Sequence, residues 1–163
     1  MRLMSNPSRS IFRAFSNLFF LTPFERDLLG IEPGSIDDAH PFVIEGCSLG
    51  MTICRDTFFD EWHTVFEDVS AWIDIKANGE HYTQDTALLF RKALPERLTL
   101  SEVDQGATVC LTGSFLDLLW EGRSAFYRET SNGVIAVGTA LGAKGEEILV
   151  DEFYFEATTL EEK

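Results

Sequence analysis

The sequence predicts a layered α/β protein, and three observations support this expectation. Short apolar stretches of strand type alternate with two stretches of helical spacing. A Ser131-Asn132-Gly133 turn lies between two further strand-like stretches and is typical of a β-hairpin. The 163 residues are 45% hydrophobic and 25% charged, which is a globular composition at the size of one domain or part of a larger one.

The first expected elements follow a polar loop. Residues 42–44 are predicted to form a short strand and residues 45–46 a tight turn. Residues 48–53 are small, β-branched or apolar without a helical period, so they predict a second strand. Residues 58–69 carry apolar side chains at helical spacing and predict a helix. Residues 71–75 predict the next strand.

The second half of the chain continues the alternation. Residues 76–81 form an expected polar loop, and residues 86–98 an amphipathic helix that Pro95 must kink or end. Further strands are expected at residues 107–111, 120–127, 134–138 and 147–155.

Charge and motifs exclude several classes of function. Thirteen basic against twenty-seven acidic residues give a net charge of −14, which repels phosphate backbones and argues against nucleic-acid binding. No apolar run reaches the roughly 18 residues of a membrane span. No phosphate-binding glycine motif, C-x-x-C pair or H-x-x-x-H spacing occurs, so we expect neither a cofactor nor a metal. Three cysteines are too few for a disulfide framework and favour a reducing, cytoplasmic location.

Residues 1–24 differ in composition from the rest of the chain. They hold three arginines and no acid, and they are rich in serine and phenylalanine. Such a segment is typical of a targeting sequence, of an amphipathic surface helix, or of a segment whose partner residues lie outside this chain. A contiguous apolar patch here would favour association of chains, so we expect a homo-oligomer. The residues of this apolar cluster are Ile11, Phe12, Phe15, Leu18, Phe19, Phe20 and Phe24.

Cys54 is the most informative single residue. It follows a predicted buried strand and precedes a predicted helix, at the kind of turn where open α/β sheets place their sites. Backbone N–H groups at such a turn, with Arg55 next to it, would favour a thiolate and could hold an oxyanion. The alternative is an inert buried thiol. For Cys47 and Cys110, which lie within apolar strands, the inert interpretation is stronger.

The stretch GMTICRDTFFDEW, residues 50–62, resembles the nucleophile segment of the carbon–nitrogen hydrolases, the nitrilase superfamily. Segments on both sides resemble the same family in the same order, between residues 21 and 155. They are Leu21–Glu25, Pro33-Gly34, Arg91–Leu98, Trp120–Ser124, Asn132–Ala136 and Glu146–Leu149.

The resemblance implies an α-β-β-α sandwich of the nitrilase type, present here as a partial, C-terminal half. Residues 1–20 do not match, residues 21–157 would form the incomplete hydrolase-like domain, and residues 158–163 an acidic tail. The implied reaction is cysteine-dependent hydrolysis of a small amide, nitrile or acylated amine. Cys54 would be the nucleophile, the backbone N–H of Arg55 an oxyanion donor, and Glu25 the supporting glutamate.

The sequence also departs from the family. Leu18 stands where the resemblance implies the catalytic lysine, and the general-base glutamate belongs to an N-terminal half that this chain lacks. We therefore expect an enzyme by family whose activity in this chain is absent or incomplete. A non-catalytic binding or scaffold domain of the same fold remains an alternative. The N-acyltransferase branch of the family is another, although the lack of a membrane span counts against it.

Overall fold

The computed structural model describes residues 20–21, 23–77, 79, 81–115 and 118–155. The chain divides into two units, residues 1–39 and 40–163. In the first unit, η1 (Phe24–Leu28) is a single turn of π-helix and η2 (Ile36–Asp38) a single 3₁₀ turn. Most of the N-terminal apolar cluster lies outside the described residues, so its role in association stays a prediction. The domain boundaries expected at residues 20 and 157 also stay predictions.

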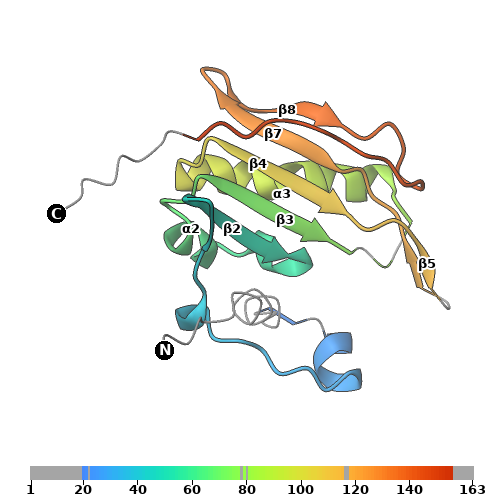
Figure 1. The fold of residues 1–163 in the computed structure, drawn as a ribbon. Helices are drawn as coiled ribbons and strands as arrows, with labels where there is room; N and C mark the ends of the chain where they lie inside the picture. The colour runs from blue at the N-terminus through green and yellow to red at the C-terminus, as the bar shows by residue number, and fades with distance from the viewer. Residues whose placement is uncertain (1–19, 22, 78, 80, 116–117, 156–163) are drawn as a thin grey trace, which may run out of the picture. The chain divides into compact units, whose positions relative to one another are not determined.

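The second unit is built on a six-stranded sheet with the order β1-β2-β3-β4-β7-β8 (Figure 1). Strands β2, β3 and β4 run parallel, and the other pairs are antiparallel. A separate hairpin pairs β5 with β6. The strands are β1 (Phe42–Ile44), β2 (Cys47–Ile53), β3 (Ala71–Lys76), β4 (Gln105–Cys110), β5 (Gly113–Phe115), β6 (Leu118–Trp120), β7 (Ala125–Thr130) and β8 (Gly133–Thr139).

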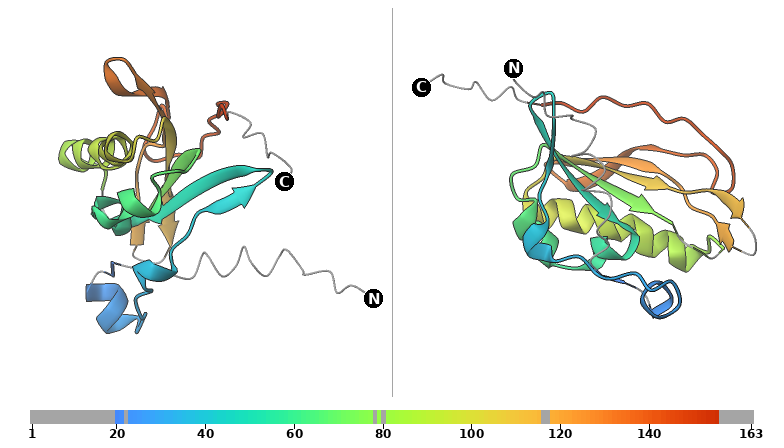
Figure 2. Two further views of the ribbon diagram at one scale, coloured as in Figure 1. Left: turned by 90° about the vertical axis from the view of Figure 1, so that its left-hand side faces the viewer. Right: turned by 60° about the horizontal axis from the view of Figure 1, so that its bottom comes forward.

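Two helices, α2 (Glu61–Val65) and α3 (Gln84–Ser101), lie on the same side of this sheet (Figure 2). The core lies between them and the strands. The ring of Phe66 stacks on Trp62 and meets Trp72 edge-on, with centroids 5.1 and 5.0 Å away. Leu94 and Leu98 of α3 are fully buried. This arrangement confirms the predicted α/β layering, and among the described residues no helix is long and apolar enough to cross a membrane.

The helices differ from the expectation in their ends. The helix predicted over residues 58–69 is divided: η3 (Cys54–Phe58) is a 3₁₀ turn, and α2 covers only Glu61–Val65. Of the two outcomes expected at Pro95, a kink or an end, the end does not occur, because α3 continues through Pro95 to Ser101. Buried neighbours on both sides of the proline, Leu94 and Leu98, hold this helix against the sheet and outweigh the one hydrogen bond that a proline removes.

The strand predicted over residues 120–127 is interrupted. Strand β6 ends at Trp120 and β7 begins at Ala125. Between them, Gly122 donates its N–H to the carbonyl of Ala143, and the Glu121 carboxylate accepts the N–H of Tyr82. Glu121 and Gly122 therefore bond to segments outside the sheet ladder instead of continuing the strand.

The prediction of a strand over residues 147–155 is also wrong, because this segment does not pair with a neighbouring strand through backbone hydrogen bonds. Side chains hold it in place. The Gln105 amide accepts the N–H of Tyr154 and donates to its carbonyl, and Arg128 donates to Asp151 and to the Glu152 carbonyl. The segment lies on the side of the sheet opposite to the helices (Figure 2). These side-chain bonds take the place of strand pairing.

Two glycines of the sheet give a matched test of its packing. A Cβ on Gly106 would lie 2.6 Å from the backbone oxygen of Trp72, whereas one on Gly138 would meet nothing nearer than 3.6 Å. We expect Gly106→Ala to lower the free energy of unfolding by about 1–3 kcal/mol or more. Gly138→Ala should change it by less than about 1 kcal/mol. Urea denaturation measures both, and equal losses would contradict this packing.

Candidate functional site

The carboxyl ends of β2, β3 and β4 bring two thiols and an amine to one edge of the sheet. Ile53 pairs with Ile75, and Lys76 pairs with Cys110. Cys54 follows Ile53 directly, so Cys54, Lys76 and Cys110 come at the ends of adjacent strands. Open α/β sheets place their ligand sites at this edge.

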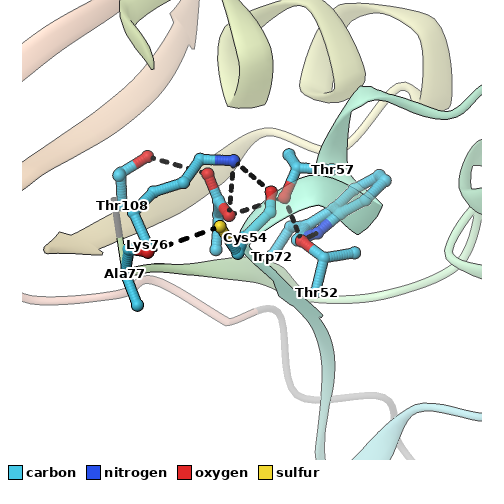
Figure 3. Close-up of polar contacts among 8 residues, drawn as sticks. Thr52, Cys54, Thr57, Trp72, Lys76, Ala77 and Thr108 are labelled. Atoms are coloured by element: carbon cyan, nitrogen blue, oxygen red, sulfur yellow. Dashed lines mark hydrogen bonds and ion pairs between the residues drawn. The ribbon is translucent and has the colours of Figure 1, made fainter. Parts of the chain in front are cut away.

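The backbone at Cys54 is strained. Its φ angle is +53°, in the left-handed region that residues with a Cβ rarely adopt. Such a conformation costs about 1–3 kcal/mol and is concentrated at functional sites. The chain leaves β2 here and enters η3, so the strand-to-helix turn predicted at Cys54 is present. The half-buried thiol donates to the carbonyl of Ala77 at 3.8 Å (Figure 3).

Lys76 lies beside this turn with no exposed side-chain surface. Its Nζ donates to the carbonyl oxygen of Cys54 at 2.7 Å (Figure 3). The same nitrogen lies 3.1 Å from Oδ1 of Asp74. The ring of Phe58 stands 4.3 Å from the same nitrogen. The sequence prediction of a polar loop from residue 76 is wrong at its start, because Lys76 is the last residue of β3 and is buried.

Asp74 ends a chain of hydrogen bonds that starts in the core. Trp72 Nε1 donates to Thr52 at 3.0 Å, the hydroxyls of Thr52 and Thr57 are 2.8 Å apart, and Thr57 donates to Asp74 at 2.5 Å. Thr57 has one hydroxyl proton and gives it to Asp74, so Thr52 must be the donor to Thr57. Burial raises the pKa of Asp74, although the ammonium of Lys76 and the Thr57 hydroxyl act in the opposite direction.

Cys110 has a different environment from Cys54. Its N–H donates to the Ser124 hydroxyl at 3.0 Å. Burial is the main cause that raises the pKa of its thiol from an ordinary 9.0 to about 12. A thiol of this kind supplies almost no thiolate at neutral pH, which fits the inert role predicted for it.

Glu121 is a second buried acid near the same sheet edge, and sequence reasoning assigned it no chemical role. Its carboxylate accepts the Tyr82 N–H at 2.8 Å and lies 3.1 Å from Lys144 Nζ and 3.3 Å from His81 Nδ1. The Tyr82 amide is the main cause that holds the pKa of Glu121 below its ordinary value, and Lys144 acts in the same direction. These contacts fasten the β6–β7 loop to the segment before α3.

A pH titration of stability tests the Glu121 contacts. Because the folded pKa of Glu121 is lowered, its contribution is present above the ordinary value of 4.5 and is lost as the pH falls through the folded pKa. Glu121→Gln should therefore be less stable than wild type at neutral pH, and the difference should close below pH 4.5. Urea midpoints measured against pH check this. Glu129→Gln, at an exposed position of β7, is the control and should follow wild type. A constant difference would contradict the prediction.

The remaining predicted site residues are placed as follows. Arg55 follows Cys54 in η3, and its guanidinium lies 5.7 Å from the ring centroid of Phe59. Glu25 lies in η1, in the first of the two units, so its role beside Cys54 stays a prediction. Leu18, which stands at the expected lysine position, lies outside the described residues.

Comparison with known proteins gives a fold but no sequence relative. No known family profile and no curated protein matches the chain. Among solved structures, the NitN amidase from Nesterenkonia sp. AN1 matches with a TM-score of 0.56 and 16% identity, over 79% of this chain and 46% of that one. Two mutants of the amidase match with a TM-score of 0.51 and 18% identity, over 70% of this chain and 40% of theirs.

One of these mutants, in which a cysteine is replaced by alanine, is described as an amidase from the nitrilase superfamily. The other, in which a glutamate is replaced by glutamine, carries the acetamide moiety of fluoroacetamide on its active-site cysteine. This chain spans less than half the length of the amidase. The predicted nitrilase-type α/β fold is therefore confirmed, over part of that architecture.

Proposed function

We propose, from the fold that it shares with part of a nitrilase-superfamily amidase, that this chain is the nucleophile-bearing part of a carbon–nitrogen hydrolase. Cys54 would be the nucleophile toward a small amide, nitrile or acylated amine. The observation that carries the proposal is the left-handed Cys54 at the carboxyl edge of the parallel strands. A strained turn at this edge is where an α/β fold displays a reactive side chain.

The reaction on an amide would proceed in two halves. The Cys54 thiolate attacks the carbonyl carbon, a C–S bond forms, and the carbonyl electrons move to the oxygen, which the Arg55 N–H would stabilise. The C–N bond then breaks, and the amine leaves with the proton that the thiol gave up. Water hydrolyses the resulting thioester to the carboxylic acid and restores the thiol. An amine acceptor in place of water would make the same acyl-enzyme an acyltransferase intermediate.

The described residues supply only part of this machinery. Loss of a general base costs roughly 10²–10⁴ in rate. Loss of one electrostatic donor to the oxyanion costs roughly 10²–10³. We therefore expect this chain alone to be acylated slowly at Cys54 and to release product more slowly still.

Competitive thiol labelling tests the proposal. Wild-type protein would be treated with substoichiometric iodoacetamide at pH 8, and the labelled peptides mapped by mass spectrometry. Cys54 should be labelled first. Cys110 should react far more slowly than an ordinary thiol, because burial raises the pKa of its thiol to about 12 and leaves little thiolate at pH 8. Equal labelling of Cys47, Cys54 and Cys110, or protection of Cys54 alone, would favour a non-catalytic binding domain.

A further inference from the structure

Two residues at the end of β3 form hydrogen bonds with Cys54, one at its carbonyl oxygen and one at its thiol. Lys76 donates to its carbonyl oxygen at 2.7 Å, and the next residue, Ala77, accepts the thiol at 3.8 Å (Figure 3). The ammonium of Lys76 is thus directed at the backbone of Cys54. Asp74 fixes the position of this ammonium as an ion pair, and the ring centroids of Phe58 and Phe90 lie 4.3 and 5.7 Å from its nitrogen.

A charged donor on this carbonyl acts on the whole peptide group. The carbonyl of Cys54 and the N–H of Arg55 belong to one planar amide, and every peptide bond of the described residues is trans. The oxygen and the hydrogen of a trans amide point in opposite directions. An anchor on the oxygen therefore directs the Arg55 N–H away from the ammonium. It also draws electron density toward the oxygen, which strengthens the N–H as a donor.

The burial of the pair supports a role beyond ordinary packing. Lys76 and Asp74 have no exposed side-chain surface, and two charges removed from water stabilise a fold poorly compared with apolar residues of the same volume. Apolar side chains would fill the same space between the sheet, η3 and α3. What they could not supply is a cation at 2.7 Å from the Cys54 carbonyl.

We propose that Lys76 is a positioning residue for the oxyanion donor: it orients and polarises the Cys54–Arg55 peptide, while Asp74 holds its ammonium in place. The proposal rests on the function proposed above for Cys54 and the Arg55 N–H. Lys76 would not replace the lysine that the family resemblance implies at the position of Leu18, because Lys76 acts through the peptide and not on the substrate.

Two reagents separate this role from an effect on the thiol. Iodoacetamide alkylates a thiolate by displacing iodide, and no oxyanion develops. In p-nitrophenyl acetate, the thiolate attacks a carbonyl carbon, an oxyanion develops, and p-nitrophenolate leaves as the thioester forms.

The rates of both reactions at Cys54 would be measured against pH in wild type, Lys76→Met and the charge-neutral double variant Asp74→Asn/Lys76→Met. The double variant keeps a folded protein available if the single one fails to fold. Arg97→Met is the control, because it removes a buried cation that pairs with Asp60 of another segment.

We expect the ratio of acylation to alkylation to fall about tenfold in both Lys76 variants and to stay unchanged in Arg97→Met. This is less than the roughly 10²–10³-fold cost of deleting one donor outright, because the N–H remains. An unchanged ratio in the Lys76 variants, or an equal fall in both rates, would overturn the role of Lys76 while leaving Cys54 as nucleophile. Wild type that is not acylated at Cys54 would overturn the proposed function itself, and the positioning role with it.

Discussion

Cys54→Ser should abolish acylation of this protein by p-nitrophenyl acetate. A serine hydroxyl carries no appreciable anion at neutral pH and needs an adjacent general base, which the described residues around Cys54 do not supply. The acylation rate should therefore fall by roughly 10³-fold or more. The measurement is the early release of nitrophenolate, together with the mass of the acetylated peptide that contains residue 54.

The matched control is Cys110→Ser. Cys110 is at the end of β4, two strands from Cys54, and burial raises the pKa of its thiol to about 12. Its replacement should leave the release of nitrophenolate unchanged. If nitrophenolate release survives in Cys54→Ser but disappears in Cys110→Ser, the nucleophile is Cys110 at the end of β4, and our proposal is wrong.

The first three strands of the second unit could be predicted closely from the sequence, although the helix expected at residues 58–69 could not. The strands at residues 42–44 and 48–53, the turn between them and the strand at residues 71–75 all form within one or two residues of their expected limits. These segments combine apolar or β-branched residues with a glycine turn, so local preference and burial agree. The strand prediction for residues 147–155 was wrong because a strand must pair with the backbone of another strand. Here the Gln105 side chain binds the backbone of Tyr154 instead.

The candidate site was predictable only in part. The turn at Cys54 follows from a buried strand that meets a polar pair, which is a local pattern. The burial of Lys76 depends on η3 and α3, which cover it with Phe58 and Phe90. Trp72, Asp74 and Lys76 alternate along β3 and therefore lie on one face of the strand. Two charged residues on one face normally indicate that this face is exposed to solvent. The left-handed φ of Cys54 has no sequence signal, because residues with a Cβ seldom adopt it.

The stability of the site depends most on the Lys76–Asp74 pair. Lys76→Met removes the ammonium and leaves the Asp74 carboxylate buried with only the Thr57 and Thr108 hydroxyls as neutral partners. Loss of one member of a buried ion pair costs about 3–5 kcal/mol, so we expect a fall of this size in the free energy of unfolding. Urea denaturation at neutral pH measures it. Lys92→Met, at an exposed position of α3, should change stability by less than about 0.5 kcal/mol.

The double variant Asp74→Asn/Lys76→Met should recover most of that loss. An asparagine at position 74 keeps an oxygen that can accept the Thr57 hydroxyl, and methionine fills the apolar space beside Phe58 without a charge. Neutral replacement of both members of a buried pair is often close to neutral in stability. The single variants Asp74→Asn and Lys76→Met form a thermodynamic cycle with wild type and the double variant. The coupling energy between the two positions should be about 2–3 kcal/mol. A coupling energy near zero would mean that Asp74 and Lys76 do not interact as a buried ion pair, and the anchor on the Cys54 carbonyl would lose its electrostatic basis.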